Sequence, residues 1–306
     1  MNSNFMKVLL TLLLSSPALL AGSFPGAAGT SGSDAISKDS LALVAWANSS
    51  LTPTYGTGVD ATWRTPNKAY GPATANTFDI VCLGNGGEII MSFPRPVRDG
   101  IGPDFAVFEN SINNTFLELA FVEVSSDGIH FFRFPNRSEG AYLIGAFGAV
   151  DPTTLNGLAG KHKIAFGTGF DLAVIPGSPL LDTNQIRFVK IIDIIGDGNT
   201  RDSTGAPIYD PFPTTGSGGF DLEAIGVIHQ NENQFKIVRS EVGETTFVLA
   251  WESNPSSFYR IETCTTLDNW TSLGVFPGVP NRGKTQHVLD RSTSSQRFWR
   301  VVWLAP

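Results

Sequence analysis

The sequence is short of charge, and its positive charges are not clustered. Charged residues make up 16% of the 306 residues, against about 25% in typical soluble domains. The formal net charge is −7, and no group of Lys and Arg is available to neutralise phosphates. An acidic protein is also repelled by anionic lipid. The composition therefore argues against a nucleic-acid partner and leaves acidic loops as candidate sites for a divalent cation.

Long apolar runs are missing as well. A helix that spans a bilayer needs about 20 apolar residues, and the apolar run at 8–14 is much shorter. This run follows Lys7 and precedes small residues at 21–23, an order that is typical of a secretory signal peptide. We expect 1–21 to be a signal peptide and the mature protein to have no transmembrane segment. The protein is then secreted or displayed at the cell surface.

Cysteines, histidines and catalytic motifs are scarce. Cys82 and Cys264 fall in different predicted domains, so we expect two buried thiols rather than a disulfide. The four histidines show no metal-ligand spacing. The residues around Ser217 do not complete a nucleophile elbow, and those around Lys161 do not complete a phosphate-binding loop. The sequence therefore predicts no catalytic residue from a known motif.

Glycine and proline are abundant instead, and they separate short runs of β-prone residues. The chain has 32 Gly and 19 Pro, as expected where many turns join short strands. In 116–124 both strand faces are apolar, which is typical of a central strand with both faces covered. This pattern predicts an all-β protein with a sandwich whose faces are partly covered by loops. Residues 40–48 favour one short helix. The clearest β-prone runs are 88–93, 105–109, 116–125, 129–134 and 220–228.

Composition divides the rest of the chain into a leader and two domains. Residues 22–38 are rich in Gly, Ala and Ser and are predicted to be a flexible leader. Residues 39–229 form the first predicted domain. Residues 235–306 contain about six strand-like runs, a spacing that suits a second, small β-sandwich.

Acidic residues gather in two stretches that contain almost no Lys or Arg. Residues 99–123 hold five carboxylates and 193–223 hold six. Several share a strand face with apolar residues, and a buried carboxylate needs a partner. Because hard oxygen ligands on loops suit Ca²⁺, we predict structural calcium in the first domain, with a solvated acidic rim as the alternative. The candidate ligands are Asp104, Glu109, Asp193, Asp197, Asp202, Asp221 and Glu223.

Two of these carboxylates keep an enzymatic alternative open. Asp221 and Glu223 are two positions apart in a predicted strand, so they share one face at roughly 7 Å. Glycoside hydrolysis uses two carboxyl groups about 5 to 10 Å apart. The spacing is common wherever a strand ends at a polar loop, and a non-catalytic protein remains the main prediction.

Aromatic residues in the predicted loops of the first domain supply candidate ligand contacts. Exposed rings stack on sugar faces while nearby polar groups bind hydroxyls. The alternative is that these rings close the ends of the sandwich. The candidates are Trp46, Trp63, Tyr70 and Tyr209.

Four motifs carry a resemblance to a known family. They are GGEII at 86–90, GPDFAVFEN at 102–110, FVEVSSDG at 121–128 and GGFDLEAIGV at 218–227. Over roughly 38–229 the sequence resembles exported bacterial "cell surface protein" sequences. The VSSDG part is similar to a strand and turn of discoidin and other galactose-binding-like jelly rolls. This resemblance implies a jelly-roll-like sandwich, frequent structural calcium, and glycan or lipid binding on loops.

The C-terminal part carries a second resemblance. YRIE at 259–262, LDNW at 267–270 and FWRV at 298–301 look like the small fibronectin-like modules of exported bacterial proteins. We expect Trp270 and Phe298 to belong to its core rather than to a ligand site.

The sequence thus predicts an all-β chain in which a jelly-roll-like β-sandwich precedes a small fibronectin-like β-sandwich. The main functional prediction is a non-catalytic exported protein that binds extracellular polysaccharide through loops organised by calcium. Two alternatives stay open. One is a structural or adhesive protein whose partner is another envelope protein. The other is a carbohydrate-active enzyme that uses paired carboxylates.

Overall fold

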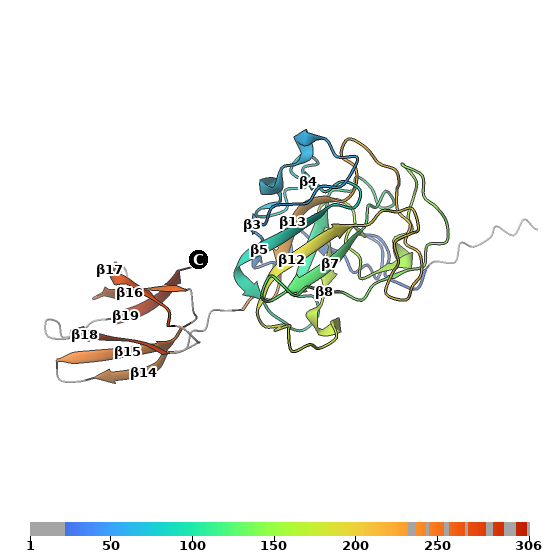
Figure 1. Ribbon diagram of the computed structural model, residues 1–306. Coiled ribbons are helices and arrows are strands. Elements are labelled where there is room, and N and C mark those ends of the chain that lie inside the picture. Colours follow the sequence, from blue (N-terminus) through green and yellow to red (C-terminus); the bar gives the residue numbers. More distant parts are fainter. Residues whose placement is uncertain are drawn as a thin grey trace, which may run out of the picture.

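The computed structural model describes residues 22–231 and most of the C-terminal part. The predicted signal peptide, 1–21, lies outside the described residues. Figure 1 shows two β bodies, the first formed by β1 to β13 and the second by β14 to β19. The described ranges of the second body are 237–242, 245–253, 257–266, 269–279, 284–290 and 298–304.

Two antiparallel sheets build the first body. The larger sheet has the order β1-β11-β6-β13-β2, with β4 also paired to β13. Its strands are β1 (Ile36–Ser37), β2 (Ala45–Trp46), β4 (Val81–Cys82), β6 (Phe105–Glu109), β11 (Phe166–Phe170) and β13 (Asp221–Val227). The second sheet has the order β3-β5-β12-β7-β8. Its strands are β3 (Ser49–Ser50), β5 (Glu88–Val97), β7 (Ala120–Ser125), β8 (Phe132–Arg133) and β12 (Ile186–Asp193).

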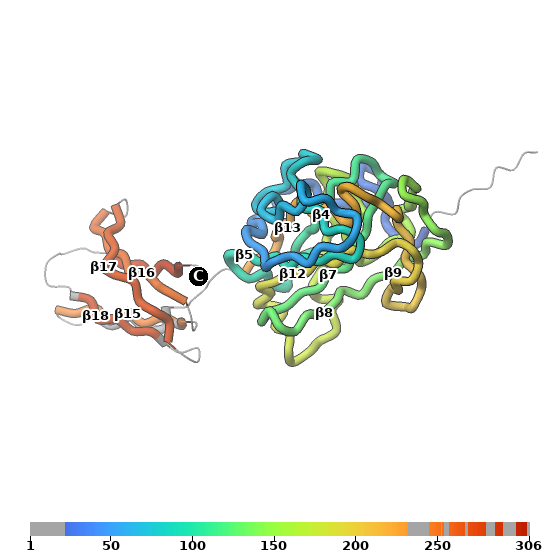
Figure 2. Tube along the Cα trace, turned by 45° about the horizontal axis from the view of Figure 1, so that its top comes forward, coloured from blue at the N-terminus to red at the C-terminus, as the bar shows by residue number. Residues whose placement is uncertain are grey.

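Long loops connect these strands, as the tube in Figure 2 shows. They contain a small ladder of β9 (Arg137–Ser138) with β10 (Leu155–Asn156). They also contain the short 3₁₀ helices η1 (Ala61–Trp63), η2 (Pro66–Ala69), η3 (Pro152–Thr154) and η4 (Leu172–Val174). Among the described residues no helix has the length and apolarity that crossing a membrane requires.

The main core lies between the two sheets. Phe105 from β6 stacks on Phe170 from β11, and both rings meet Phe134 edge-on at 5.0 to 5.8 Å between centroids. All residues of β6 and β13 are buried, because a second apolar layer that includes Trp46 covers the outer face of their sheet. The structure therefore confirms the all-β sandwich, with central strands covered on both faces.

The segment predicted to be a flexible leader is joined to the first body. Its β1 pairs with β11, and the Asp34 carboxylate binds Lys161 Nζ at 3.0 Å and His162 Nε2 at 2.9 Å. The helix expected at 40–48 does not form, because this stretch supplies β2 and bonds to β13. A sheet edge thus outweighs a weak local helix preference.

The second body is a small β-sandwich of two three-stranded antiparallel sheets. The sheet orders are β14-β15-β18 and β17-β16-β19. Trp251, Tyr259 and Ile261 are buried at its centre. Both Cys82 and Cys264 are free and buried, which confirms the prediction of two thiols. The strands are β14 (Ile237–Val242), β15 (Thr246–Glu252), β16 (Phe258–Cys264), β17 (Thr271–Pro277), β18 (Lys284–Asp290) and β19 (Phe298–Leu304).

Candidate functional site

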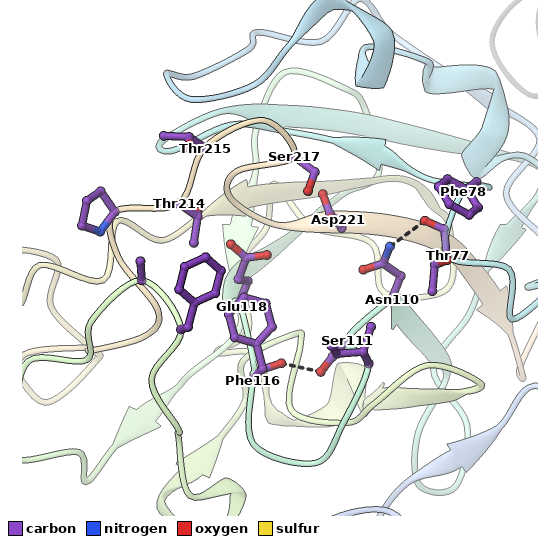
Figure 3. Close-up of a pocket in the computed structure, with 14 residues that line it drawn as sticks. Thr77, Phe78, Asn110, Ser111, Phe116, Glu118, Thr214, Thr215, Ser217 and Asp221 are labelled. Carbon is purple, nitrogen blue, oxygen red and sulfur yellow. Dashed lines mark hydrogen bonds between the residues drawn. The ribbon is translucent and has the colours of Figure 1, made fainter.

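A pocket of about 380 Å³ opens in the first body where β6 ends and β13 begins. Four loops form it: Thr77 and Phe78 before β4, Asn110 to Phe116 between β6 and β7, Ala146 and Phe147 between β9 and η3, and Pro213 to Ser217 before β13. Figure 3 shows these segments around one space. The pocket therefore draws together parts of the chain that are far apart in the sequence.

Two carboxylates form the polar floor of this pocket. Glu118 and Asp221 are each 5% exposed, and both groups point into the pocket in Figure 3. Within the described part of the chain, Glu118 Oε1 and Asp221 Oδ1 have no hydrogen-bond partner. The Thr214 hydroxyl lies beside Glu118 and the Cys82 thiol lies beside Asp221, and each favours the ionised form of its neighbour. One oxygen of each carboxylate stays unpaired.

Burial makes the charged forms of these acids unfavourable. It raises the pKa of Asp221 to about 7, and the nearby Asp193 adds to the effect. Burial also raises the pKa of Glu118 well above its usual value, with further contributions from Asp221 and Glu109. Of the described residues that line the pocket, none is Lys, Arg or His. The site is therefore rich in acceptors and has no cation of its own.

Apolar side chains form the rim above this floor. Phe147 is 91% exposed, Ile112 is 72% exposed and Phe78 is 63% exposed, and all three line the pocket. Phe147 stacks on Phe116 at 6.5 Å, and Phe78 stacks on Trp63 at 6.1 Å between centroids. A polar floor beneath exposed rings is an arrangement that binds the polar and apolar faces of one ligand.

Local hydrogen bonds fix the loops that carry these groups. Asn110 Nδ2 donates to the Thr77 carbonyl at 3.1 Å, and the Ser111 hydroxyl donates to the Phe116 carbonyl. On the other side, Gly219 N donates to Thr214 Oγ1 at 3.0 Å. Gly219 has φ +76, and a Cβ there would lie 2.5 Å from the backbone of Gly84, so only glycine fits this turn.

Most carboxylates predicted as calcium ligands bind main-chain N–H groups. Asp193 accepts from Gly86 N and Phe220 N. Asp202 accepts from Ser138 N, Thr204 N and Ala206 N. These carboxylates link separate loops, and the partner that a buried carboxylate requires is here the backbone.

The remaining predicted ligands are similarly placed. Glu109 accepts from Ser111 N at 2.8 Å, and Asp197 accepts from Asn199 N at 2.9 Å. Glu223 accepts from Ala75 N at 2.5 Å and does not line the pocket, whereas Asp221 does. Asp221 and Glu223, the pair considered for glycoside hydrolysis, therefore do not line the same pocket.

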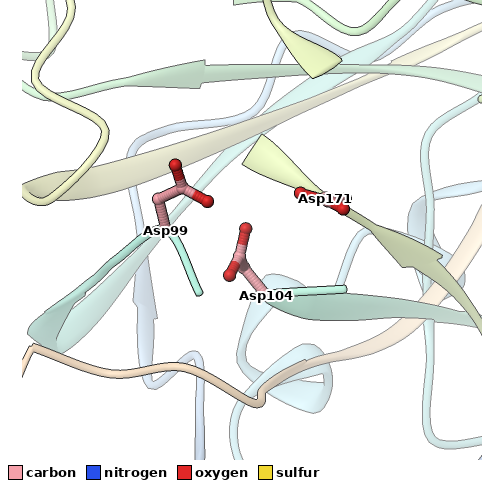
Figure 4. A group of neighbouring side chains, drawn as sticks. All are labelled: Asp99, Asp104 and Asp171. Atoms are coloured by element: carbon pink, nitrogen blue, oxygen red, sulfur yellow. The ribbon is translucent and has the colours of Figure 1, made fainter. Parts of the chain in front are cut away.

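Among the described residues, one group of carboxylates could hold a metal ion. Asp99, Asp104 and Asp171 each offer an oxygen within 4.8 Å of the others, and Figure 4 shows the three side chains converging. Of these, Asp104 was predicted, but Asp99 and Asp171 were not. The group lies just before β6, while the pocket lies just after it. At about 3.3 Å per residue the two are roughly 20 Å apart along this strand.

The predicted aromatic contacts are distributed over the first body. Trp46 packs on Phe108 at 5.5 Å between centroids, and the Tyr70 hydroxyl hydrogen-bonds Ser50 Oγ at 2.8 Å. Tyr209 is half-buried. Trp63 alone of the four adjoins the pocket, through its stacking on Phe78.

Sequence reasoning missed Glu118, Phe78 and Phe147 as site residues. Glu118 had a usable signal: it lies between Phe116 and Ala120 on one face of an otherwise apolar run. A carboxylate at such a position is buried or lines a pocket. Phe78 and Phe147 lie in loops without periodicity, and their shared pocket depends on the tertiary fold.

Comparisons with known proteins add no assignment. No family model matches the chain, and the search of curated proteins gives no match.

Proposed function

We propose that the protein is a carbohydrate-binding protein whose ligand occupies the pocket above Glu118 and Asp221. The observation that carries this proposal is the pair of unpaired carboxylate oxygens in a pocket that exposed aromatic rings also line. Sugar hydroxyls donate to such oxygens, and the C–H face of a sugar packs on a ring such as Phe147. Ser217 and Asn110 add further polar groups to the same pocket.

The biological setting is part of the same proposal. The signal-like N-terminus supports export, and the ligand is then an extracellular polysaccharide met by a secreted or cell-surface protein. The resemblance to exported cell surface proteins agrees with this setting. If no glycan binds, the alternative of an envelope protein with a protein partner takes its place.

Removing the Phe147 ring is expected to weaken glycan binding. Phe147→Ala should lower affinity about tenfold, or about 1.4 kcal/mol, because a stacking surface is lost while the mostly exposed side chain contributes little to folding. A glycan array identifies the ligand, and isothermal titration calorimetry measures the change. Tyr142→Ala is the matched control, since Tyr142 is exposed in the same loop region but does not line the pocket. Equal losses in both variants would contradict the assigned site.

We also propose that Ca²⁺ is the ion for Asp99, Asp104 and Asp171. All three ligands are hard carboxylate oxygens, which are the ligands that Ca²⁺ prefers. Structural Zn²⁺ sites are built mainly from Cys sulfur and His nitrogen. A bound cation would offset the repulsion between carboxylates that lie so close. The role is structural, because the group and the pocket lie at opposite ends of β6.

Calcium is expected to raise the melting temperature of the protein by about 5 to 10 °C. A ligand present at a hundredfold excess over its Kd stabilises the folded state by about 2.7 kcal/mol. For a domain of this size, each kcal/mol of added stability raises the melting temperature by about 2 to 4 °C. Asp171→Asn should abolish the shift, whereas Asp197→Asn should leave it unchanged. Identical melting curves in millimolar Ca²⁺ and in EGTA would rule out calcium at this group.

A further inference from the structure

The pocket floor offers acceptors and no charged donors. Glu118 Oε1 and Asp221 Oδ1 are buried and unpaired, and a ligand must supply the N–H or O–H groups that complete them. The other polar lining groups are Asn, Ser and Thr side chains, which carry no charge. Any positive charge in this pocket must therefore come with the ligand.

The surroundings of the floor add negative charge. Glu118 interacts electrostatically with Asp221, Glu109 and Asp210, and Asp221 interacts with Asp193. A neutral sugar would fill the pocket without stabilising the ionised form of these acids. A protonated amine brings one positive charge and three N–H donors, and its hydrogen bonds to carboxylates are the stronger, charge-assisted kind.

The rim also favours a cation. Phe78, Phe116 and Phe147 line the same pocket as the two carboxylates, and aromatic faces attract ammonium groups within about 6 Å. Carboxylates and aromatic rings in one pocket thus provide both components of ammonium recognition.

On the basis of the proposed carbohydrate binding, we propose that the pocket recognises the protonated amine of an amino sugar, with the ammonium bound between Glu118 and Asp221. The ligand class is a polysaccharide that contains hexosamine units with a free, non-acetylated amine. N-acetylation removes the positive charge of the amine and two of its three N–H donors. An N-acetylated sugar is therefore expected to bind Glu118 and Asp221 more weakly.

Proton linkage gives this proposal a second readout. The pKa of Asp221 is about 7 in the free protein because of burial and Asp193, while the Cys82 thiol acts in the opposite direction. Glu118 faces Asp221, Glu109, Asp210 and the Thr214 hydroxyl. An ammonium ion favours the ionised carboxylates, so binding below about pH 7 releases protons.

The test compares two tetrasaccharides that differ only in acetylation. Calorimetry on the full mature chain at about pH 6 uses β-1,4-linked glucosamine and its fully N-acetylated counterpart, in two buffers of different ionisation enthalpy. We expect the amine form to bind at least about tenfold more tightly, or about 1.4 kcal/mol, with net proton release. Glu118→Gln should abolish most of this preference and reduce the proton release. Glu88→Gln, at a glutamate outside the pocket, should change neither.

Each other outcome overturns the inference in a recognisable way. Equal affinity for both tetrasaccharides, or tighter binding of another glycan without an amine, removes amine recognition and leaves the carbohydrate-binding function standing. No binding of either tetrasaccharide together with a blank glycan array removes both. Tight binding of a lysine-containing peptide without binding of amino sugars assigns the pocket to a protein partner instead. A thermal melt of Glu118→Gln shows whether the variant is folded.

Discussion

The first body is expected to become less stable as the pH rises from about 4.5 to about 8. The folded-state pKa of both Asp193 and Asp221 is raised from 3.8 to about 7, by burial in each case. The folded protein therefore binds more protons than the unfolded chain in this window, and the free energy of unfolding falls as pH rises. A single carboxyl with this shift accounts for a loss on the order of 4 kcal/mol.

Carboxylates with a lowered pKa affect stability in a different pH range. Asp34 is partly buried, but hydrogen bonds from His162 and Lys161 lower its pKa to about 2. The stability that Asp34 contributes is fully present above pH 3.8, the ordinary pKa of an Asp carboxyl. This contribution is lost only as the pH falls toward 2. Above about pH 4.5 the contribution of Asp34 is constant. The carboxyl groups with a raised pKa therefore decide whether stability rises or falls with pH.

Urea unfolding at several pH values measures this effect. Asp221→Asn should flatten the pH dependence and raise stability at about pH 8, because it removes a buried charge and keeps an acceptor for the Cys82 thiol. Asp60→Asn, at an exposed position, is the control and should retain the slope of the parent protein. Stability that rises with pH in this window would show that the carboxylates are neutralised by another group.

The same carboxylates link stability to the proposed binding. A pocket that keeps one oxygen each of Glu118 and Asp221 unpaired in the free protein is less stable than one with amides in their place. Variants of these acids should gain melting temperature at neutral pH and lose ligand affinity. A rise in melting temperature together with a loss of affinity distinguishes residues that bind the ligand from residues that only stabilise the fold.

Strand periodicity predicted much of the fold. The run at 105–109 coincides with β6, and the run at 220–228 contains β13. Both are buried on all sides, as apolar residues on both faces indicate. Loops were predicted less well, since the leader at 22–38 contains β1 and the expected helix at 40–48 contains β2. Two-residue strands leave no periodicity to detect, because their pairing depends on a sheet edge that only the folded chain provides.

The site was predicted in part. Burial was expected for Glu109 and Asp193 from the apolar residues on their strand faces, and both are buried. Asp104, Asp202 and Asp221 are buried as well, which their local sequence did not indicate. Sequence alone could not assign their partners, because a carboxylate that bonds two loop N–H groups has the same local pattern as one that binds a cation. The difference between Asp193, with both oxygens bonded, and Asp221, with one oxygen unpaired, arises from loop geometry.

Asp104 gives the largest expected effect of a single substitution. Its buried carboxylate accepts from Gly100 N and Leu172 N, each at 2.7 Å, and bonds His229 Nδ1 at 2.7 Å. Asp104→Ala leaves these donors without an acceptor, at a cost of about 1 to 3 kcal/mol for each buried group. We expect a loss of about 3 to 5 kcal/mol in the free energy of unfolding.

Measuring this loss in EGTA separates the hydrogen-bonding role of Asp104 from any role in binding an ion. In EGTA, Asp104→Ala should keep its full cost, because the backbone donors are present with or without a cation. Asp171→Ala should cost far less there, since the main-chain bond of its carboxylate goes to Ala173 N in the short helix η4. Asp104→Asn should fall between the two, as its amide keeps one acceptor and turns a donor toward another N–H. A cost for Asp104→Ala that vanishes in EGTA would mean that this carboxylate stabilises the fold through a bound cation and not through the loops that it joins.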